Sequence, residues 1–225
     1  MLRVAVTALL FACAATCVAQ ESKPLEAKLP LVDEGAGDAT WSRFRARLLE
    51  ALAKRDGKYV LAVVDPQIRN TTGKRGSAEF RKLWEPQSET SVLWVELPKV
   101  LYLGSKLVRN KGRAPETCAP YVYYTWPEQS NPDNSGAITA REALVKTRPA
   151  TDSPTLRMLA YEVVTVLDWE VADEDSEARQ KWVKVKTAGS EGYVPEEQIR
   201  SPLEYRACFV KGESGWRMTA LEVGE

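Results

Sequence analysis

The feature that most constrains the fold is a change in residue patterning at Asn131–Gly136, a turn-rich segment with the sequence NPDNSG. Beyond it, short β-prone runs alternate with polar residues and are separated by turns or by the acidic loop Ala172–Arg179. Such spacing indicates a small antiparallel barrel, whose closure removes exposed strand edges. We therefore predict a barrel over residues 136–201, with its clearest strands at Ala143–Thr147, Val163–Leu167, Trp182–Lys186 and Gly192–Pro195.

The residues before this boundary have mixed patterning, which predicts an α+β domain over residues 40–135. A first helix is expected after Thr40, a candidate N-cap, because apolar residues then recur at helical spacing until Asp56-Gly57 ends the pattern. Two further amphipathic helices are expected, one capped by Ser77 and ending near Trp84, and one over residues 90–103 that Pro98 would bend or split.

Two apolar runs of this domain favour strands. Lys58–Val64 is β-branched and apolar, although the run also fits a second buried helix, and Asp65-Pro66 ends it. Tyr121–Trp126 is aromatic and β-prone, so we expect a strand there.

The C-terminal residues predict a final hairpin. Tyr205–Val210 and Trp216–Val223 flank a Gly-Glu-Ser-Gly turn. This hairpin lies beyond the end of the small barrel and needs another sheet for pairing. We therefore expect residues 202–225 to complete the first domain, which makes the whole chain an α+β protein.

The first nineteen residues predict a cleaved secretory signal. Arg3 precedes an apolar stretch, Val4–Ala15, that is shorter than the roughly 20 residues needed to span a bilayer. Small residues then precede a cut before Gln20, and polar residues 20–39 follow as an expected flexible linker. The alternatives are a buried N-terminal helix or a lipoprotein signal at Cys13 or Cys17, which would anchor the protein to a membrane.

The charge balance narrows the class of partner. Removing Arg3 with the signal leaves 30 basic and 31 acidic residues. No basic stripe with interleaved aromatic residues is present, so we expect no nucleic-acid partner. No later segment is long and apolar enough to cross a bilayer, so we expect no integral membrane segment after cleavage and a periplasmic or secreted location.

Cysteine usage agrees with export. Only Cys118 and Cys208 remain after signal cleavage, and both lie in strand-like runs. Two thiols in an oxidising compartment commonly form one disulfide. We expect this pair to be bonded, with two buried free thiols as the alternative.

Three runs in the predicted barrel carry a family resemblance. Leu144–Thr151 resembles the opening strand and turn of the bacterial SH3-like (SH3b) domain family, and Leu159–Leu167 resembles its next run, with Tyr161-Glu162 where a glycine is often found. Trp182–Lys186 followed by Gly189 and Gly192-Tyr193-Val194 resembles its "W-x-x-V … G-x-x-G-W-V" pattern. The resemblance implies an SH3-like antiparallel β-barrel, with both glycines at a tight turn that needs positive φ and with Trp182, Val185 and Val194 filling its core.

The remainder of the chain has a weaker resemblance. Its N-terminal helix and its C-terminal hairpin are similar to the cone-shaped α+β fold of the nuclear transport factor 2 and ketosteroid isomerase type. In that arrangement the barrel is inserted before the last strands. The alternative is an α+β domain followed by an extended SH3-like domain. The whole layout also resembles uncharacterised exported bacterial proteins, which implies no activity.

The residue inventory argues against catalysis. The chain has no histidine, which removes the commonest general base and metal ligand, and it has no nucleotide-binding glycine motif. The acidic residues Asp173, Glu174 and Asp175 are clustered in a loop and favour a solvated surface over a glycosidase pair. Asp65 could serve as a ketosteroid-isomerase-like base, although local turn formation explains it equally well. We therefore predict a non-enzymatic protein without catalytic residues, metal or cofactor.

Aromatic side chains of the barrel are the candidate ligand-binding residues. SH3-type barrels commonly bind extended peptides along an aromatic groove. Tyr161, Trp169 and Tyr193 come from loops or strand ends where such a groove could lie, and core packing is the alternative for each. The expected partner is a peptide, peptidoglycan or an envelope protein. The alternative function is small-molecule binding or weak enzymatic activity in a cone-shaped first domain.

Overall fold

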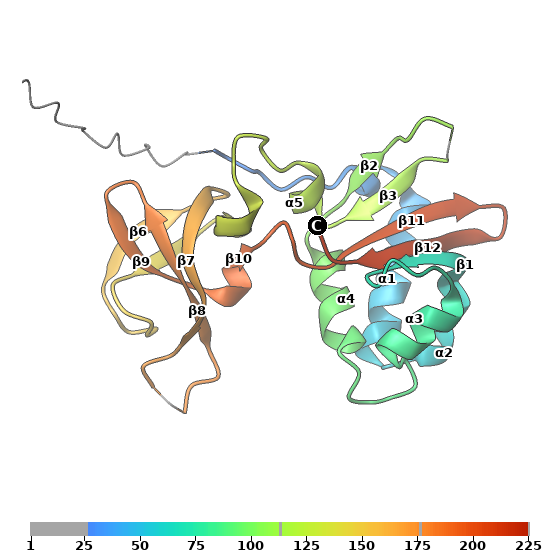
Figure 1. The fold of residues 1–225 in the computed structure, drawn as a ribbon, viewed down its shortest axis with the longest axis horizontal. Helices are drawn as coiled ribbons and strands as arrows, with labels where there is room; N and C mark the ends of the chain where they lie inside the picture. The colour runs from blue at the N-terminus through green and yellow to red at the C-terminus, as the bar shows by residue number, and fades with distance from the viewer. Residues whose placement is uncertain (1–26, 113, 176, 225) are drawn as a thin grey trace, which may run out of the picture.

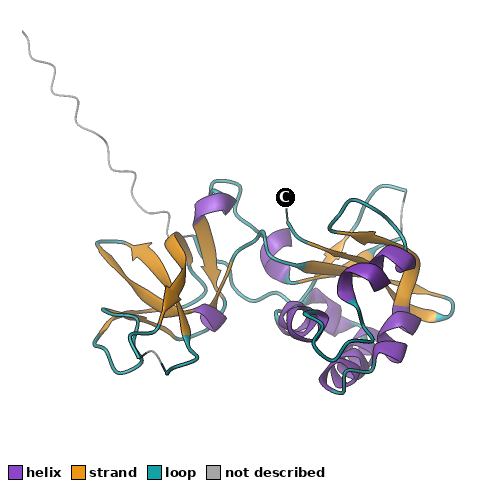
Figure 2. Ribbon diagram, turned by 60° about the horizontal axis from the view of Figure 1, so that its bottom comes forward, coloured by secondary structure: helices purple, strands orange, loops and turns teal. Residues whose placement is uncertain are grey.

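The computed structural model describes residues 27–112, 114–175 and 177–224, which form two units that each contain their own sheet (Figure 1). The predicted signal over residues 1–19 and the first part of the predicted linker lie outside the described residues. Figure 2 shows that helices gather in one unit and that strands dominate the other. The predicted α+β class is therefore confirmed.

The first unit is built on a five-stranded sheet of order β1-β12-β11-β3-β2. Its pairs are antiparallel except β1 with β12, which is parallel. The final hairpin thus occupies the centre of the first sheet, where β12 pairs with β1 and β11 pairs with β3. The strands are β1 (Val64–Asn70), β2 (Lys106–Val108), β3 (Glu116–Ala119), β11 (Arg206–Gly212) and β12 (Gly215–Glu222).

Helices cover one face of this sheet and bury the main core against it. Trp41 and Leu52 from the first helix meet Phe209 and Leu221 from the central strands in one cluster, and all four side chains are almost fully buried. The helices of this layer are α1 (Ala39–Ala53), α2 (Gly57–Val63), α3 (Ser77–Trp84) and α4 (Leu93–Tyr102). The short α5 (Tyr121–Tyr124) lies outside this core.

Several local predictions in this unit are wrong. The N-caps of two helices differ from those expected, and a third helix is not divided. Asp38, not Thr40, is the N-cap of α1, because its carboxylate accepts the amides of Thr40 and Trp41. Gly76, not Ser77, precedes α3 as N-cap. Pro98 does not split α4, which continues from Leu93 to Tyr102.

Two of the predicted strands are helical. Lys58–Val63 belongs to α2, where the Asp56 carboxylate accepts the Tyr59 amide, so the alternative of a second helix holds. Tyr121–Tyr124 forms a single helical turn directly after Pro120. Asp65-Pro66 lies inside β1, which is an edge strand with irregular register. A proline is tolerated there because its missing N–H costs the sheet no hydrogen bond.

The second unit is a seven-stranded antiparallel sheet of order β10-β4-β7-β8-β9-β5-β6. It encloses its own cluster, in which Ile138, Val145, Val166, Val185 and Val194 are buried. Its strands are β4 (Ser135–Ile138), β5 (Ala143–Lys146), β6 (Thr155–Leu159), β7 (Val163–Ala172), β8 (Lys181–Thr187), β9 (Ser190–Pro195) and β10 (Ile199–Arg200).

The predicted closed barrel is wrong in one respect, because among the described residues β6 and β10 end the sheet without pairing to each other. Gly189 has φ of +88°, as the turn requires, but Gly192 lies in β9 without positive φ. Gly192 is needed for close packing instead, since an added Cβ would lie 2.5 Å from Val145 Cγ1. Trp182 is buried outside the core cluster and donates to Asp173 Oδ2 at 2.7 Å.

Residues 27–33 join the two units, so the flexible-linker prediction is wrong for this part. Lys28 forms an antiparallel bridge with Glu162 of the second unit. The Leu29 side chain is 4% exposed. It packs with Tyr121 and Val122 from the first unit and Ala137 and Val163 from the second. In Figure 1 this blue segment runs from the strand-rich unit to the helical unit. We call it the strap.

Candidate functional site

A cleft of about 520 Å³ lies between the two units and is the candidate binding site. Its first wall comes from the C-terminal end of α4, with Lys99, Tyr102 and Leu103. Its second wall comes from β7, β8 and β10 and from the short helical turn Glu196–Gln198. Tyr102 is 73% exposed and reaches the cleft as a solvent-facing ring. The wall formed by the first unit therefore contributes an aromatic ring to the cleft.

Trp169 of β7 gives the opposite wall its aromatic surface. The ring is partly buried and packs against the core cluster of the second unit. Its Cη2 atom lies 2.9 Å from the position that a Cβ on Gly136 would occupy, so the absence of a side chain at Gly136 makes room for the ring. Trp169 is thus held by core contacts on one side and lines the cleft on the other, a fixed geometry that suits an apolar contact with a ligand.

Arg200 of β10 also lines the cleft and is nearly inaccessible, with its side chain 5% exposed. Its Nη1 atom lies 2.9 Å from Glu204 Oε2, and its Nη2 atom donates to the Tyr205 carbonyl at 2.7 Å. Burial lowers the pKa of Arg200, and the nearby Glu204 carboxylate opposes that shift. Its Nε–H has no hydrogen-bond partner among the described residues. Arg200 therefore fixes the floor of the cleft through its bonds to Glu204 and to the Tyr205 carbonyl.

Charged groups of both signs line the cleft together with Arg200. Among the described residues, Arg179 and Lys181 have no acidic partner, whereas Lys99 pairs with Glu96 at 3.0 Å. On the acidic side, Glu197 accepts from Gln180 Nε2 at 2.7 Å. Two aromatic rings, together with basic and acidic side chains, suit the binding of an extended polar chain such as a peptide.

The structure does not gather the three aromatic residues that the sequence suggested. Of Tyr161, Trp169 and Tyr193, only Trp169 lines the cleft. Tyr193 precedes the core residue Val194 in β9 and so faces outward, opposite Lys184 in β8.

Tyr161 lies in the turn before β7, with φ of +55°. Its carbonyl accepts the Leu29 amide at 2.7 Å, and its own amide donates to the Ala140 carbonyl at 3.3 Å. The backbone of Tyr161 therefore holds the strap, which is a structural role.

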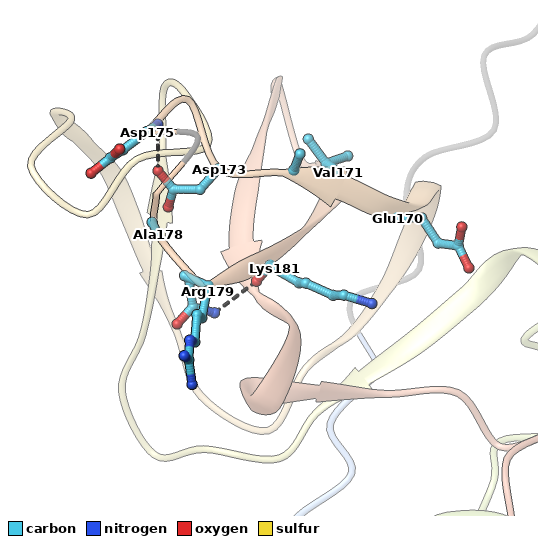
Figure 3. Close-up of a pocket in the computed structure, with 9 residues that line it drawn as sticks. Glu170, Val171, Asp173, Asp175, Ala178, Arg179 and Lys181 are labelled. Atoms are coloured by element: carbon cyan, nitrogen blue, oxygen red, sulfur yellow. Dashed lines mark hydrogen bonds between the residues drawn. The ribbon is translucent and has the colours of Figure 1, made fainter.

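The acidic loop between β7 and β8 surrounds a hollow of about 340 Å³ (Figure 3). Its carboxylates serve nearby groups: Asp173 accepts from the Asp175 amide at 2.9 Å, and Asp175 accepts from the Glu177 amide at 3.0 Å. Glu174 pairs with Arg148. Asp65 likewise accepts from the Gln67 amide at 2.8 Å, as in a local turn. These carboxylates are engaged in local structure.

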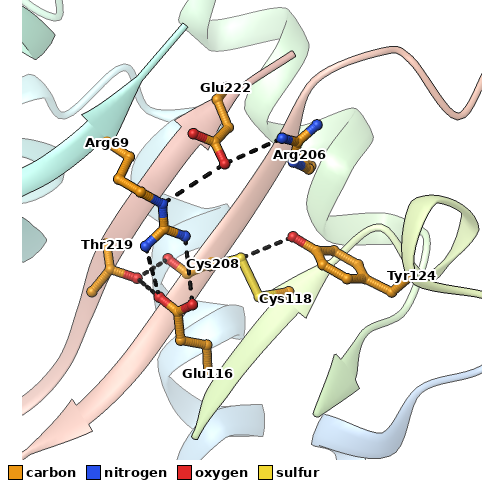
Figure 4. Close-up of a disulfide and its surroundings, with 8 residues drawn as sticks. All are labelled: Arg69, Glu116, Cys118, Tyr124, Arg206, Cys208, Thr219 and Glu222. Carbon is orange, nitrogen blue, oxygen red and sulfur yellow. Dashed lines mark hydrogen bonds and ion pairs between the residues drawn. A yellow bond between two sulfur atoms is a disulfide. The ribbon is translucent and has the colours of Figure 1, made fainter. Parts of the chain in front are cut away.

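The Cys118–Cys208 disulfide is confirmed and lies on the sheet face opposite the main core (Figure 4). The Tyr124 hydroxyl lies 3.0 Å from Cys208 Sγ, and burial raises the Tyr124 pKa well above its usual range. Glu116 lies beside both sulfur atoms, but these are bonded to each other and offer no thiolate ligands to a metal.

A polar network that sequence reasoning missed surrounds this disulfide. Arg69 of β1 lies 3.3 Å from Glu116 of β3 and 3.8 Å from Glu222 of β12. Arg206 of β11 reaches the same Glu222 carboxylate at 3.3 Å. These residues are far apart in sequence, and only the strand order brings them together.

Comparison with family models, with curated proteins and with solved structures finds no match for this chain. The assignment of function therefore depends on the geometry of the cleft and on the residue inventory. Within the described ranges, no helix has the length and apolarity needed to cross a bilayer.

Proposed function

We propose that this chain is a non-catalytic exported protein of the bacterial cell envelope, whose SH3-like second unit binds an extended peptide. The peptide would belong to peptidoglycan or to an envelope protein. The observation that carries the proposal is the cleft between the units, which is lined by Trp169 from the second unit, by Tyr102 from the first unit and by charged groups of both signs. Rigid aromatic walls suit extended peptides because little entropy is lost on contact.

Two backbone features support an SH3-like origin of the second unit. Tyr161 occupies the left-handed region at the position where the family resemblance expects a glycine. Gly189 also has positive φ, at the turn between β8 and β9 where the resemblance expects it. An open edge in place of complete closure is the main departure from the expected barrel.

Export is supported by the bonded cysteines. Disulfides persist in oxidising compartments and are rare in the cytosol. Together with the signal-like residues 1–19, the Cys118–Cys208 bond favours a periplasmic or secreted location, and a lipid anchor stays the alternative.

The non-catalytic part of the proposal follows from chemistry that the chain does not contain. Without histidine, the chain cannot form a Ser-His-Asp or Cys-His site. The carboxylates of the acidic loop are engaged in local hydrogen bonds and an ion pair.

The packing of the first unit gives no support to the small-molecule alternative. That alternative needs an enclosed apolar pocket between the helices and the final hairpin. This space is filled by aromatic rings: Trp41 lies 5.0 Å from Phe209 and 5.1 Å from Trp216, measured between ring centroids. We therefore favour the cleft between the units.

A binding experiment with envelope material tests the proposed function. The mature chain is incubated with purified cell walls and, separately, with an envelope protein extract, and retained protein is measured. We expect retention on at least one of them and a loss of at least about tenfold in affinity for Trp169→Ala, since a central aromatic contact commonly contributes 2 kcal/mol or more. The matched control is Leu167→Ala, which removes an exposed side chain of the same strand outside the cleft. The proposal would be refuted if neither the cell walls nor the envelope protein extract retained the chain.

A further inference from the structure

The edge strand β6 has unpaired backbone groups. Within the described part of the chain, it ends the seven-stranded sheet and pairs only with β5. On its outer side, no described residue makes a backbone hydrogen bond to Thr155–Leu159. Such an edge can accept a further strand unless charge, proline or a covering segment blocks it.

Apolar side chains accompany this edge. Leu144 of β5 and Met158 of β6 are direct cross-strand neighbours, and they are 42% and 55% exposed. Leu156 of the same strand is 44% exposed. Three exposed apolar side chains on one hairpin suit the alternate residues of an added strand.

The charge at this edge is positive. Arg157 and Lys28 share the single carboxylate of Glu162, at 3.7 Å and 2.7 Å. Lys146 donates to the Ser153 carbonyl, and it has no carboxylate partner among the described residues. A strand added here would meet more cations than anions, which favours acidic residues in that strand.

We propose that β6 is a docking edge for an extended segment of a partner protein in which acidic and apolar residues alternate. The segment adds as an antiparallel or parallel strand beside β6, so that its backbone hydrogen-bonds to the free edge, its acidic residues lie on the face of Arg157 and its apolar residues lie on the face of Met158. A second copy of this chain fits less well, because a two-fold antiparallel pairing centred on Arg157 would place that cation opposite itself. This site is separate from the proposed peptide cleft at Trp169.

Synthetic peptides test the edge directly. The probe is a fluorescein-labelled peptide of alternating glutamate and valine, compared by anisotropy with a lysine-valine peptide and with a glutamate-valine peptide N-methylated at alternate residues. We expect the first to bind at least about tenfold more tightly than either of the others, since several opposite-charge pairs and backbone bonds are lost. Arg157→Glu should reverse the charge preference, and Met158→Ser should weaken binding to the acidic peptide because it removes an apolar contact without changing the charge.

The controls separate this edge from the cleft. Leu167→Ala and Trp169→Ala should leave binding of the acidic peptide unchanged, because neither residue lies on the β5–β6 hairpin. Equal binding of the three peptides, or binding of none, would overturn the edge proposal while leaving the cleft untouched. A peptide-independent dimer in analytical ultracentrifugation that Met158→Ser dissociates would assign the edge to a second copy. Binding that appears only after removal of residues 20–26 would assign it to the chain's own N-terminal segment, and either result would overturn the proposal.

Discussion

The Tyr121 hydroxyl donates a hydrogen bond to the Leu29 backbone carbonyl at 3.0 Å, across the seam between the two units. Burial raises the pKa of Tyr121 to about 12, so the phenol stays protonated and acts as a donor throughout the physiological range. The bond fastens the strap to α5, while the backbone of Tyr161 holds the same residue from the second unit. The cleft between the units therefore depends on a segment that lies outside both sheets.

Truncating Leu29 should loosen this seam. Leu29→Ala removes a side chain that is 4% exposed, so we expect the free energy of unfolding in urea to fall by about 2–4 kcal/mol. Leu31→Ala is the matched control, since Leu31 is 50% exposed and its truncation should change stability by less than about 0.5 kcal/mol. Equal effects of the two substitutions would show that the strap does not stabilise the seam.

Removing the disulfide should destabilise the first unit. Cys118 and Cys208 are separated by 90 residues, and closing a loop of that length contributes about 4 kcal/mol in the chain-entropy model. We expect Cys118→Ala/Cys208→Ala to lose about that much in urea unfolding, and we expect added reductant to have no further effect on the double variant. An unchanged free energy of unfolding would mean that the disulfide adds no stability beyond that of the strand pairing.

Gly192 should not tolerate even a methyl group. An added Cβ would lie 2.5 Å from Val145 Cγ1 and 2.7 Å from the Lys146 carbonyl oxygen, and the backbone atom cannot move without disturbing β5. We expect Gly192→Ala to lower the free energy of unfolding by about 2 kcal/mol or more. Gly37→Ala, where a Cβ meets open space, should stay within about 0.5 kcal/mol of the wild type.

The N-cap of α1 should make stability depend on pH in the acid range. The Thr40 hydroxyl and amide hydrogen-bond to the Asp38 carboxylate and lower its pKa from 3.8 to about 2. Because the folded-state pKa is the lower one, the ionised cap stabilises the folded chain above the ordinary pKa, and this contribution is lost as pH falls from about 4 to about 2.

Unfolding measured in urea at several pH values checks this sign. The stability difference between the wild type and Asp38→Ala should narrow as pH falls through that window. Asp38→Asn is the control, because its amide oxygen can also cap a helix but does not titrate. A difference between the wild type and Asp38→Ala that stays constant down to about pH 2 would contradict the assignment of the cap.

The cleft could be predicted only in part. The sequence indicates partial exposure of Trp169, because the acidic residues Asp168 and Glu170 flank it. Arg200 and Tyr102 carried no such signal, because their place in the cleft depends on how β10 and α4 face each other. Tyr161 and Tyr193 were equally plausible in sequence, but a turn and the outward face of β9 separate them from the cleft.

Local pattern alone determined the helix of Trp41 and Leu48, the strands around Val145, Val185 and Val194, and the pairing expected of Cys118 and Cys208. These features depend on side-chain periodicity and residue chemistry, which can be read from residues close together in the sequence. Tertiary structure alone decided that Tyr121–Tyr124 turns into a helix, that Pro66 enters a strand and that the strap joins two units. The physical reason is that burial and edge position depend on contacts between segments far apart in the chain, and no local pattern encodes them.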